Sequence, residues 1–155
     1  MKHIVLFLLF TLFLMGCMNL YQPPLPDFEI NSVEDAMAIC KDITPAYDPV
    51  FLNLDFWKAP EETYYLGEGD CEDVGILFLY LCREYLDMDN LVLGKCYVPW
   101  GTAGHAIVID YESGTIYDVF SELPICDVND TRYDIVGFLE YDEVMANLGA
   151  KVNSF

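Results

Sequence analysis

Residues 67–74 read Gly-Glu-Gly-Asp-Cys-Glu-Asp-Val and run directly into an apolar segment, residues 75–86. The glycines favour a turn, because glycine adopts positive φ at little cost. Asp70 is a candidate N-cap, and the acids that follow Cys71 suit the first turn of a helix, where they complement its dipole. Apolar side chains then recur at helical spacing over a wide face. The stretch therefore predicts a buried helix that begins at Cys71 and ends near Leu86.

Upstream of this helix, the sequence predicts one further helix and an irregular segment. Ser32 is a candidate N-cap, and apolar residues at helical spacing continue to Ile43, before Pro45 ends the helix. Residues 47–62 contain two more prolines and predict irregular structure with at most one short helix. The helix of Cys71 is thus preceded mainly by helical and irregular chain.

Downstream of the helix, alternating and β-branched residues predict strands. The predicted strands are residues 91–98, 105–111, 115–120 and 133–138, and a short helix is predicted at residues 142–148. Residues 121–134 predict a loop. Because helices come first and an antiparallel sheet follows, the predicted fold class is α+β.

Composition limits the classes of function. The 155 residues suffice for one domain, and 54% hydrophobic and 15% aromatic residues indicate a folded globule. The formal charge is −19, with only seven Lys and Arg residues. This charge excludes electrostatic binding to nucleic acid and disfavours binding to anionic lipid headgroups. The charge favours solubility, and the alternative is a preference for basic substrates.

The N-terminus predicts export. Two polar residues, Lys2 and His3, precede an apolar run at residues 4–15, which is too short to span a bilayer but suits a signal peptide. The run ends in Leu14-Met15-Gly16-Cys17, which resembles the lipobox of bacterial lipoproteins and implies cleavage before Cys17 and acylation of its sulfur. An ordinary secretory signal or a membrane stub is the alternative.

This interpretation divides the chain into three parts. Residues 1–16 are the predicted lipoprotein signal peptide, residues 17–30 are the lipidated cysteine with a Pro-rich tether, and residues 31–155 are the folded domain. Three prolines within four residues favour extended polyproline II structure in the tether. The predicted location is the cell envelope, at its periplasmic or extracellular face, with the lipid on Cys17 as the membrane anchor.

Cys71 is the candidate nucleophile. A helix N-terminus lowers the pKa of a thiol, whereas the neighbouring acids Asp70, Glu72 and Asp73 oppose a second negative charge. The dipole alone is therefore insufficient, and an imidazole partner is needed. The chain has two histidines, and one leaves with the signal peptide, so His105 is the candidate base.

A histidine base needs a third group that orients it. A four-residue loop that ends in a left-handed Gly114 pairs Asp110 with Thr115 and, further along the hairpin, His105 with Phe120. Side chains two residues apart on a strand lie on the same face of the sheet. A one-residue slip of the register would move a side chain to the opposite face relative to its partner strand.

This register makes Asp118 the candidate orienting carboxylate, on the same face as His105 and one diagonal away. Asp110 is closer in sequence but has the wrong parity. Glu122 has the right parity and is the second choice. The candidate catalytic residues are therefore Cys71, His105 and Asp118.

Three segments carry a family resemblance: Gly69-Asp70-Cys71-Glu72-Asp73, Gly104-His105-Ala106-Ile107-Val108 and Tyr117-Asp118-Val119. Together they resemble the transglutaminase-like cysteine peptidase superfamily, and most of all its bacterial transglutaminase-like cysteine proteinases, over roughly residues 55–120. The resemblance implies a papain-like core, with the nucleophile helix packed on an antiparallel sheet. It also implies thiolate attack on an amide carbonyl and an acyl-enzyme that is released to water or to an amine.

The resemblance further implies an oxyanion site at the Cys71 backbone N–H and one upstream donor. Trp57 and Tyr64 are candidates for that donor, although packing is the simpler interpretation of both. Some members of the group bind calcium through acids beside the cysteine, for which Asp70 and Glu72 would serve; helix capping is the favoured interpretation of these acids. The chemistry itself requires no cofactor.

The remaining cysteines are open to two interpretations. Cys40, Cys82, Cys96 and Cys126 allow two disulfides beside one free nucleophile, or they are buried thiols. A bridge between Cys71 and Cys82 is excluded, because eleven residues of helix separate them by about 16 Å. No CxxC pair is present, so the sequence does not predict a zinc site.

The sequence therefore predicts an exported, thiol-dependent amide hydrolase that acts on peptides or proteins through an acyl-enzyme. Amine transfer to protein glutamine is an alternative, because only the acceptor of the acyl group differs. A non-catalytic binding module on the same fold is another, and the intact Cys, His and Asp speak against it. The compact size favours hydrolysis.

Overall fold

The computed structural model of the chain describes residues 22–47, 55–99, 104–149 and 151–152. The predicted signal peptide and the predicted lipidation at Cys17 lie outside these residues. The helices are α2 (Val33–Lys41), α3 (Pro60–Leu66), α4 (Cys71–Leu86) and α5 (Tyr141–Ala146). In the part of the chain that is described, none of these helices is long and apolar enough to cross a membrane.

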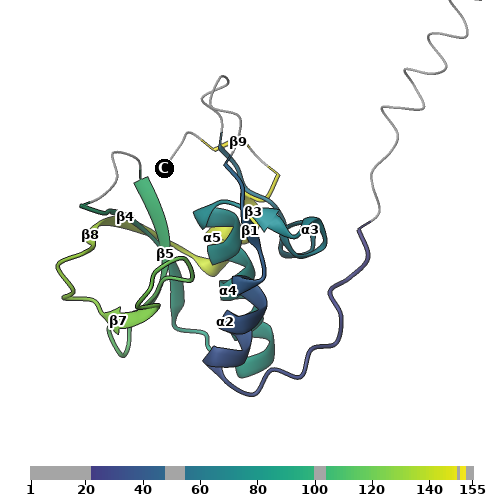
Figure 1. The fold of residues 1–155 in the computed structure, drawn as a ribbon, viewed down its shortest axis with the longest axis horizontal. Helices are drawn as coiled ribbons and strands as arrows, with labels where there is room; N and C mark the ends of the chain where they lie inside the picture. The colour runs from purple at the N-terminus through teal and green to yellow at the C-terminus, as the bar shows by residue number, and fades with distance from the viewer. Residues whose placement is uncertain (1–21, 48–54, 100–103, 150, 153–155) are drawn as a thin grey trace, which may run out of the picture.

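Five strands form the main antiparallel sheet (Figure 1). They are β4 (Leu91–Tyr97), β5 (Gly104–Asp110), β6 (Thr115–Tyr117), β7 (Ile125–Asp127) and β8 (Asp134–Glu140), in the order β7-β6-β5-β4-β8. Two short pairs join distant segments: β1 (Thr44–Pro45) with β3 (Glu68–Gly69), and β2 (Asp55–Phe56) with β9 (Lys151–Val152). The predicted α+β class is confirmed.

The central helix α4 begins and ends as its sequence predicts. Asp70 caps the helix by accepting a hydrogen bond from the Asp73 backbone N–H at 3.5 Å, and the Asp73 carboxylate reaches back to the Asp70 N–H at 3.4 Å. Such a capping box satisfies two backbone donors that a helix start leaves unpaired. The helix ends at Asp87, which adopts a left-handed conformation with φ 54°.

Helix α2 begins at the predicted cap and ends earlier than predicted. The Ser32 side chain accepts from the Asp35 backbone N–H at 3.2 Å. The helix stops at Lys41, because the chain then extends to pair β1 with β3. This pairing, with hydrogen bonds from Thr44 N to Gly67 O and from Ala46 N to Gly69 O at 2.9 Å each, supports the glycine-rich turn before α4.

Part of the predicted tether packs on the domain. Ile30 is buried in the main hydrophobic cluster, and Leu25 and Phe28 pack against it. An extended proline-rich backbone has carbonyl groups that accept no internal hydrogen bond. Two tyrosine hydroxyls donate to such carbonyls: Tyr65 to Pro24 O at 2.8 Å, and Tyr85 to Pro26 O at 3.1 Å. Residues 24–30 therefore lie against α3 and α4.

The sheet separates two hydrophobic clusters. One face packs on α4, with Leu93, Ala106 and Val108 in the main cluster beside the helix. The other face forms a second cluster, which includes Ile107, Ile116 and Tyr133. Alternate residues of β4, β5 and β6 enter opposite clusters, as the period of a strand requires.

One strand prediction is wrong in its limits, and one loop prediction is wrong because the segment contains a strand. The strand predicted at residues 115–120 ends at Tyr117, because the Asp118 carboxylate accepts from Phe120 N at 3.1 Å and turns the chain. The loop predicted at residues 121–134 contains β7, which pairs with β6. Asp118 N donates to Pro124 O at 2.8 Å and joins the two sides of this turn.

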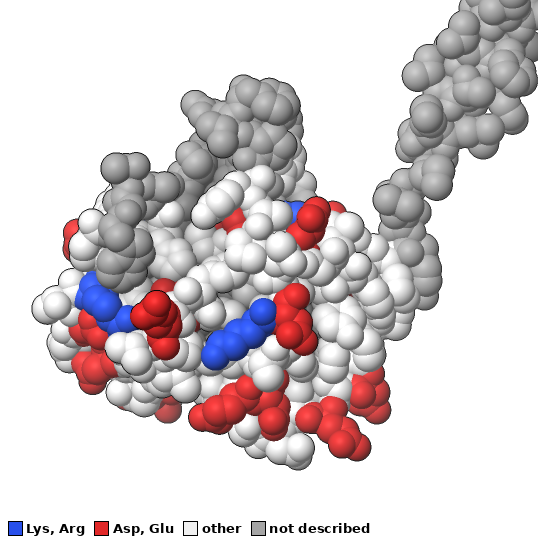
Figure 2. All heavy atoms as spheres, in the orientation of Figure 1, with Lys and Arg blue, Asp and Glu red and all other residues white. Residues whose placement is uncertain are grey.

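The five cysteines among the described residues are free thiols. Cys40, Cys82 and Cys96 are buried, whereas Cys71 and Cys126 are partly buried. The sequence allowed either two disulfides or buried thiols for Cys40, Cys82, Cys96 and Cys126, and in the structure all four are free thiols. Figure 2 shows that acidic side chains outnumber basic ones on the face in view, in keeping with the charge of −19.

Candidate active site

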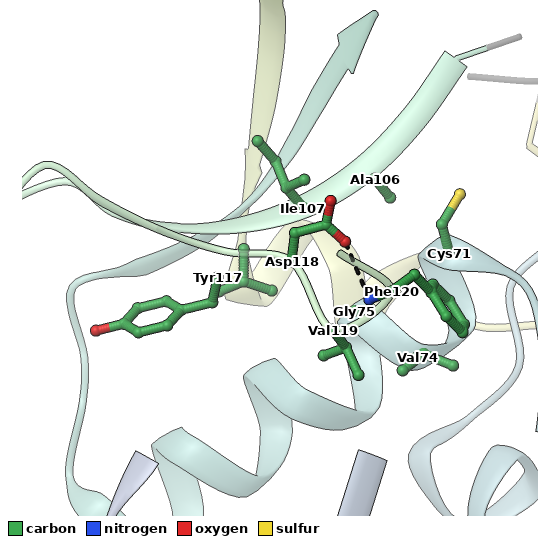
Figure 3. A pocket seen from close by; sticks show the side chains of 10 residues that line it. Cys71, Val74, Gly75, Ala106, Ile107, Tyr117, Asp118, Val119 and Phe120 are labelled. Atoms are coloured by element: carbon green, nitrogen blue, oxygen red, sulfur yellow. Dashed lines mark hydrogen bonds between the residues drawn. The ribbon is translucent and has the colours of Figure 1, made fainter. Parts of the chain in front are cut away.

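Cys71 is the first residue of α4, directly after the glycine-rich turn. Gly69 is required there, because a Cβ would lie 2.8 Å from the Asp73 Cβ and 3.3 Å from the Thr63 Cγ2. The Cys71 thiol is partly buried and lines a small cavity of about 10 Å³ together with Ala106 and Asp118. In Figure 3, the Cys71 side chain extends from the start of α4 on the side of Ala106.

The surroundings of Cys71 favour the neutral thiol. Its Sγ donates to Glu72 Oε2 at 2.9 Å. Burial and the negative charge of Glu72 raise the pKa of Cys71 far above its ordinary value, and Asp70 adds a smaller effect in the same direction. A hydrogen bond from the Ala106 backbone lowers the pKa and opposes them. The acids therefore oppose thiolate formation, as their position in the sequence predicts.

His105 lies at the start of β5 and contacts the predicted carboxylate. Its Nε2 donates to Asp118 Oδ2 at 2.9 Å, since a carboxylate can only accept. The His105 side chain is 18% exposed and that of Asp118 only 4%. The bond leaves Nδ1 of His105 as the ring nitrogen for another partner. Among the described residues, no hydrogen bond joins Cys71 to His105.

The hairpin register brings His105 and Asp118 to one face, as predicted. Asp110 pairs with Thr115, and Gly114 is left-handed with φ 71°. The predicted pair of His105 and Phe120 does not form, because β6 ends before it.

The other two carboxylates considered for this role lie elsewhere. Asp110 accepts from the backbone N–H groups of Glu112 and Ser113 at 2.9 and 3.0 Å and from Asn90, so it closes the turn. Glu122 is exposed in the segment between β6 and β7.

Tyr133 is a neighbour of the site that sequence reasoning missed. Its hydroxyl donates to Asp118 Oδ2 at 2.9 Å, the same oxygen that binds His105. Tyr133 is 6% exposed, and burial raises the pKa of its phenol well above the ordinary value, so it stays a donor at neutral pH. The bond spans 15 residues and has no local sequence signal.

The two aromatic candidates for the oxyanion site are well packed. Trp57 is 1% exposed and belongs to the main hydrophobic cluster. The Tyr64 ring packs edge-on against Phe28, with 5.2 Å between ring centroids. Both positions agree with packing, and an oxyanion role for either stays a prediction.

The acids considered for calcium are engaged in capping and in contacts with protein groups. Asp70 caps α4, and Glu72 accepts from the Cys71 thiol. The next acid along the helix, Asp73, which the sequence did not suggest as a calcium ligand, forms an ion pair with Lys58. Calcium takes six to eight oxygen ligands. In the described parts of the chain, no group of three or more His, Cys, Asp or Glu residues could hold a metal ion. The residues that the structure describes therefore do not fit a calcium site.

Comparison by sequence finds no relative: no protein-family model matches this chain, and no curated protein matches it. Comparison with solved structures finds LapG from Legionella pneumophila, at 20% identity and a TM-score of 0.56 over 70% of this chain and 63% of LapG. Calcium-bound LapG matches at 19% identity and a TM-score of 0.57, over 79% and 72% of the two chains. EGTA-treated LapG matches at 20% identity and a TM-score of 0.55, over 70% of this chain and 61% of LapG.

The present chain thus spans less than two thirds of two of these three LapG chains. At this level of identity the likeness bears on the fold alone. The match agrees with the arrangement of elements described above, in which helix α4 packs on one face of an antiparallel sheet. The chain therefore has an α+β fold with a papain-like, transglutaminase-like core.

Proposed function

We propose that this protein is an exported thiol-dependent amide hydrolase, with Cys71 as nucleophile, His105 as base and Asp118 as the orienting carboxylate. The observation that carries the proposal is the bond from His105 Nε2 to Asp118 Oδ2, which leaves Nδ1 for the thiol. The similarity in fold to LapG, a transglutaminase-like cysteine protease, supports a peptidase-like enzyme.

The position of the thiol supports this assignment. The backbone of Ala106, the residue after His105, lowers the pKa of the Cys71 thiol, and Cys71 and Ala106 line the same small cavity. Catalytic hydrogen bonds often tighten only when substrate is bound, so a thiol that donates to Glu72 in the resting protein is compatible with later transfer to His105.

The proposed reaction follows from these positions. The thiol proton passes to His105 Nδ1 as Sγ bonds to the amide carbonyl carbon, and the Cys71 N–H at the helix start donates to the oxyanion. The imidazolium then protonates the leaving amine as the C–N bond breaks, which leaves a thioester. Water gives a proton to His105 and attacks the thioester, and the carboxylic acid and the free thiol are released. Asp118 keeps the ring oriented and stabilises the imidazolium.

The substrate is proposed to be a peptide or protein. Comparison of surface proteins from cells with the active enzyme and cells with Cys71→Ala identifies the substrate by the fragments that appear only with the active enzyme. Once it is known, Cys71→Ala, His105→Ala and Asp118→Asn each reduce its cleavage by about a hundredfold or more. Cys126→Ala is the matched control, because it removes the other partly buried thiol.

A labelling experiment tests the roles without a substrate. His105→Ala is expected to slow the alkylation of Cys71 by iodoacetamide, and to leave the alkylation of Cys126 unchanged. Equal labelling of all five thiols, with no effect of His105→Ala, would favour the non-catalytic binding module.

Hydrolysis and amine transfer are separated by their products. With a glutamine peptide and a fluorescent amine, the proposed hydrolase releases free acid and leaves the peptide unlabelled. Incorporation of the amine would establish transfer instead.

The proposed location is the cell envelope, with a lipid anchor on Cys17. The basis is the sequence Leu14-Met15-Gly16-Cys17 after an apolar run. Wild-type protein is expected in the membrane fraction and in the detergent phase, and Cys17→Ser is expected to abolish both. Membrane association unchanged by Cys17→Ser would contradict the anchor.

A further inference from the structure

Three carboxylates crowd the start of α4 around Cys71. Asp70 and Glu72 are each 8% exposed, and Asp73 is 0% exposed. Buried carboxylates are costly unless a positive charge or hydrogen-bond donors compensate them. A positive charge that compensates these acids would therefore help to fix the position of Cys71.

Lys58 places a positive charge against the most buried of the three acids. Its Nζ forms an ion pair with Asp73 Oδ2, and its backbone N–H donates to Asp73 Oδ1 at 2.8 Å. The Lys58 side chain is 18% exposed. One residue thus binds both oxygens of Asp73, from a position 15 residues upstream.

Asp73 connects this ammonium to the capping of the nucleophile helix. Its Oδ2 accepts from the Asp70 backbone N–H at 3.4 Å, and its own backbone N–H donates to Asp70. Cys71 lies between these two capping residues. A displacement of the Asp73 carboxylate would therefore displace the backbone on both sides of the nucleophile.

We infer that the ammonium of Lys58 is the built-in cation of this acidic turn, and that the turn around Cys71 assembles without a bound calcium ion. Lys58 is a positioning residue, which acts on Cys71 through Asp73. The inference rests on the proposed role of Cys71 and distinguishes this chain from LapG, which has been solved in a calcium-bound form.

The donor geometry supports the inference. Both oxygens of Asp73 already accept from Lys58, and Asp70 is engaged in the capping box. Calcium would need six to eight oxygens arranged around one point, and a neighbouring ammonium would repel it. A tethered ammonium also needs no free ion, so the proposed activity would not depend on the calcium concentration.

The first test is the response of the purified protein to calcium. The Tm of the wild type is expected to be the same with CaCl₂ as with EGTA, and isothermal titration calorimetry with CaCl₂ is expected to show no binding at the turn. A calcium-dependent rise in Tm that Asp70→Asn and Glu72→Gln abolish would overturn the inference. Neither readout requires catalysis, so the result stands apart from failure of the proposed hydrolase.

The second test is the pH dependence of Cys71 alkylation by iodoacetamide. Lys58→Met is expected to shift the profile to higher pH, because the turn loses the positive charge of Lys58. Lys58→Arg keeps a positive charge there, and its profile is expected to stay close to that of the wild type. Lys41→Met, at the exposed end of α2, is the matched control and should leave the profile unchanged. A Lys58→Met profile identical to that of the wild type would overturn the positioning role.

A double variant covers the case in which Lys58→Met does not fold. Lys58→Met with Asp73→Asn removes both members of the ion pair, so neither charge is left buried without its partner. The double variant is expected to fold and still to show an altered alkylation profile. A double variant that folds with a wild-type profile would also overturn the inference.

Discussion

At the scale of single residues, the groups around Cys71 have opposite effects on the pKa of its thiol. The Glu72 carboxylate accepts from its thiol and raises the pKa of Cys71, whereas the Ala106 backbone lowers that pKa. Burial and Glu72 prevail, so the resting thiol is neutral. Activation in the proposed enzyme therefore consists in moving the thiol proton from the influence of Glu72 to His105.

Glu72→Gln is expected to lower the pKa of Cys71, because it removes the largest negative charge acting on the thiol. Each unit of decrease raises the thiolate fraction at neutral pH about tenfold. The measurement is the rate of iodoacetamide alkylation against pH. Glu68→Gln, on the exposed side of the same turn, is the control and should behave as the wild type. An unchanged rate in Glu72→Gln would show that burial alone holds the thiol neutral.

Tyr133→Phe is expected to lower kcat of the proposed hydrolysis by about tenfold, which is the effect of one hydrogen bond to a buried charged group. Tyr133 acts through Asp118, so the pH profile of kcat/KM should shift while KM changes little. Tyr111→Phe is the control, because this tyrosine is 58% exposed. If Tyr133→Phe altered only Tm and left the pH profile in place, the hydroxyl would be structural.

At the scale of elements, the β5–β6 hairpin aligns His105 with Asp118. Its register depends on the left-handed Gly114, whose amide donates to Asp110 O at 2.9 Å. The alignment could be predicted from the sequence because a tight hairpin pairs residues close in the chain. The end of β6 could not, because the turn that Asp118 makes with Phe120 is held by a second contact, from Asp118 N to Pro124 O in the following segment, which is not part of the hairpin.

Gly114→Ala is expected to destabilise the fold by about 1–2 kcal/mol, because a side chain is strained at positive φ. The added Cβ would also lie 3.3 Å from Val128 Cγ1. Thermal unfolding should show a decrease in Tm of about 2–8 °C. Gly137→Ala is the control, because it has open space around it and no positive φ. Equal Tm values for the two variants would count against the left-handed turn.

At the scale of the whole molecule, burial controls the thiols far from the site. Cys82 and Cys96 lie in the two hydrophobic clusters on opposite faces of the sheet. Burial raises the pKa of each from an ordinary 9.0 to about 12. The folded protein therefore retains these protons in a pH range in which the unfolded chain releases them.

The free energy of unfolding is consequently expected to be constant up to about pH 9 and to fall between pH 9 and 12, because the unfolded state binds fewer protons there. Urea unfolding at a series of pH values measures this dependence. Cys82→Ala should make the decrease shallower, whereas Cys126→Ala is the control at the less buried thiol. Stability that stays flat to pH 11 would contradict the burial of these thiols.

The sequence by itself determined the features that rest on neighbouring residues. These are the capped start of α4 at Cys71, its length, the left-handed turn at Gly114 and the shared face of His105 and Asp118. Capping boxes, helical periodicity and hairpin register all act over a few residues or one short turn, so the local pattern is sufficient.

Only the tertiary structure decided which distant groups contact the residues of the candidate site. Tyr133 reaches Asp118 across 15 residues, and Lys58 reaches Asp73 across another 15. The order of strands, with β8 beside β4, is likewise not a local property. These contacts arise because segments far apart in the chain bury their apolar faces against each other, and the packing then sets which polar groups meet.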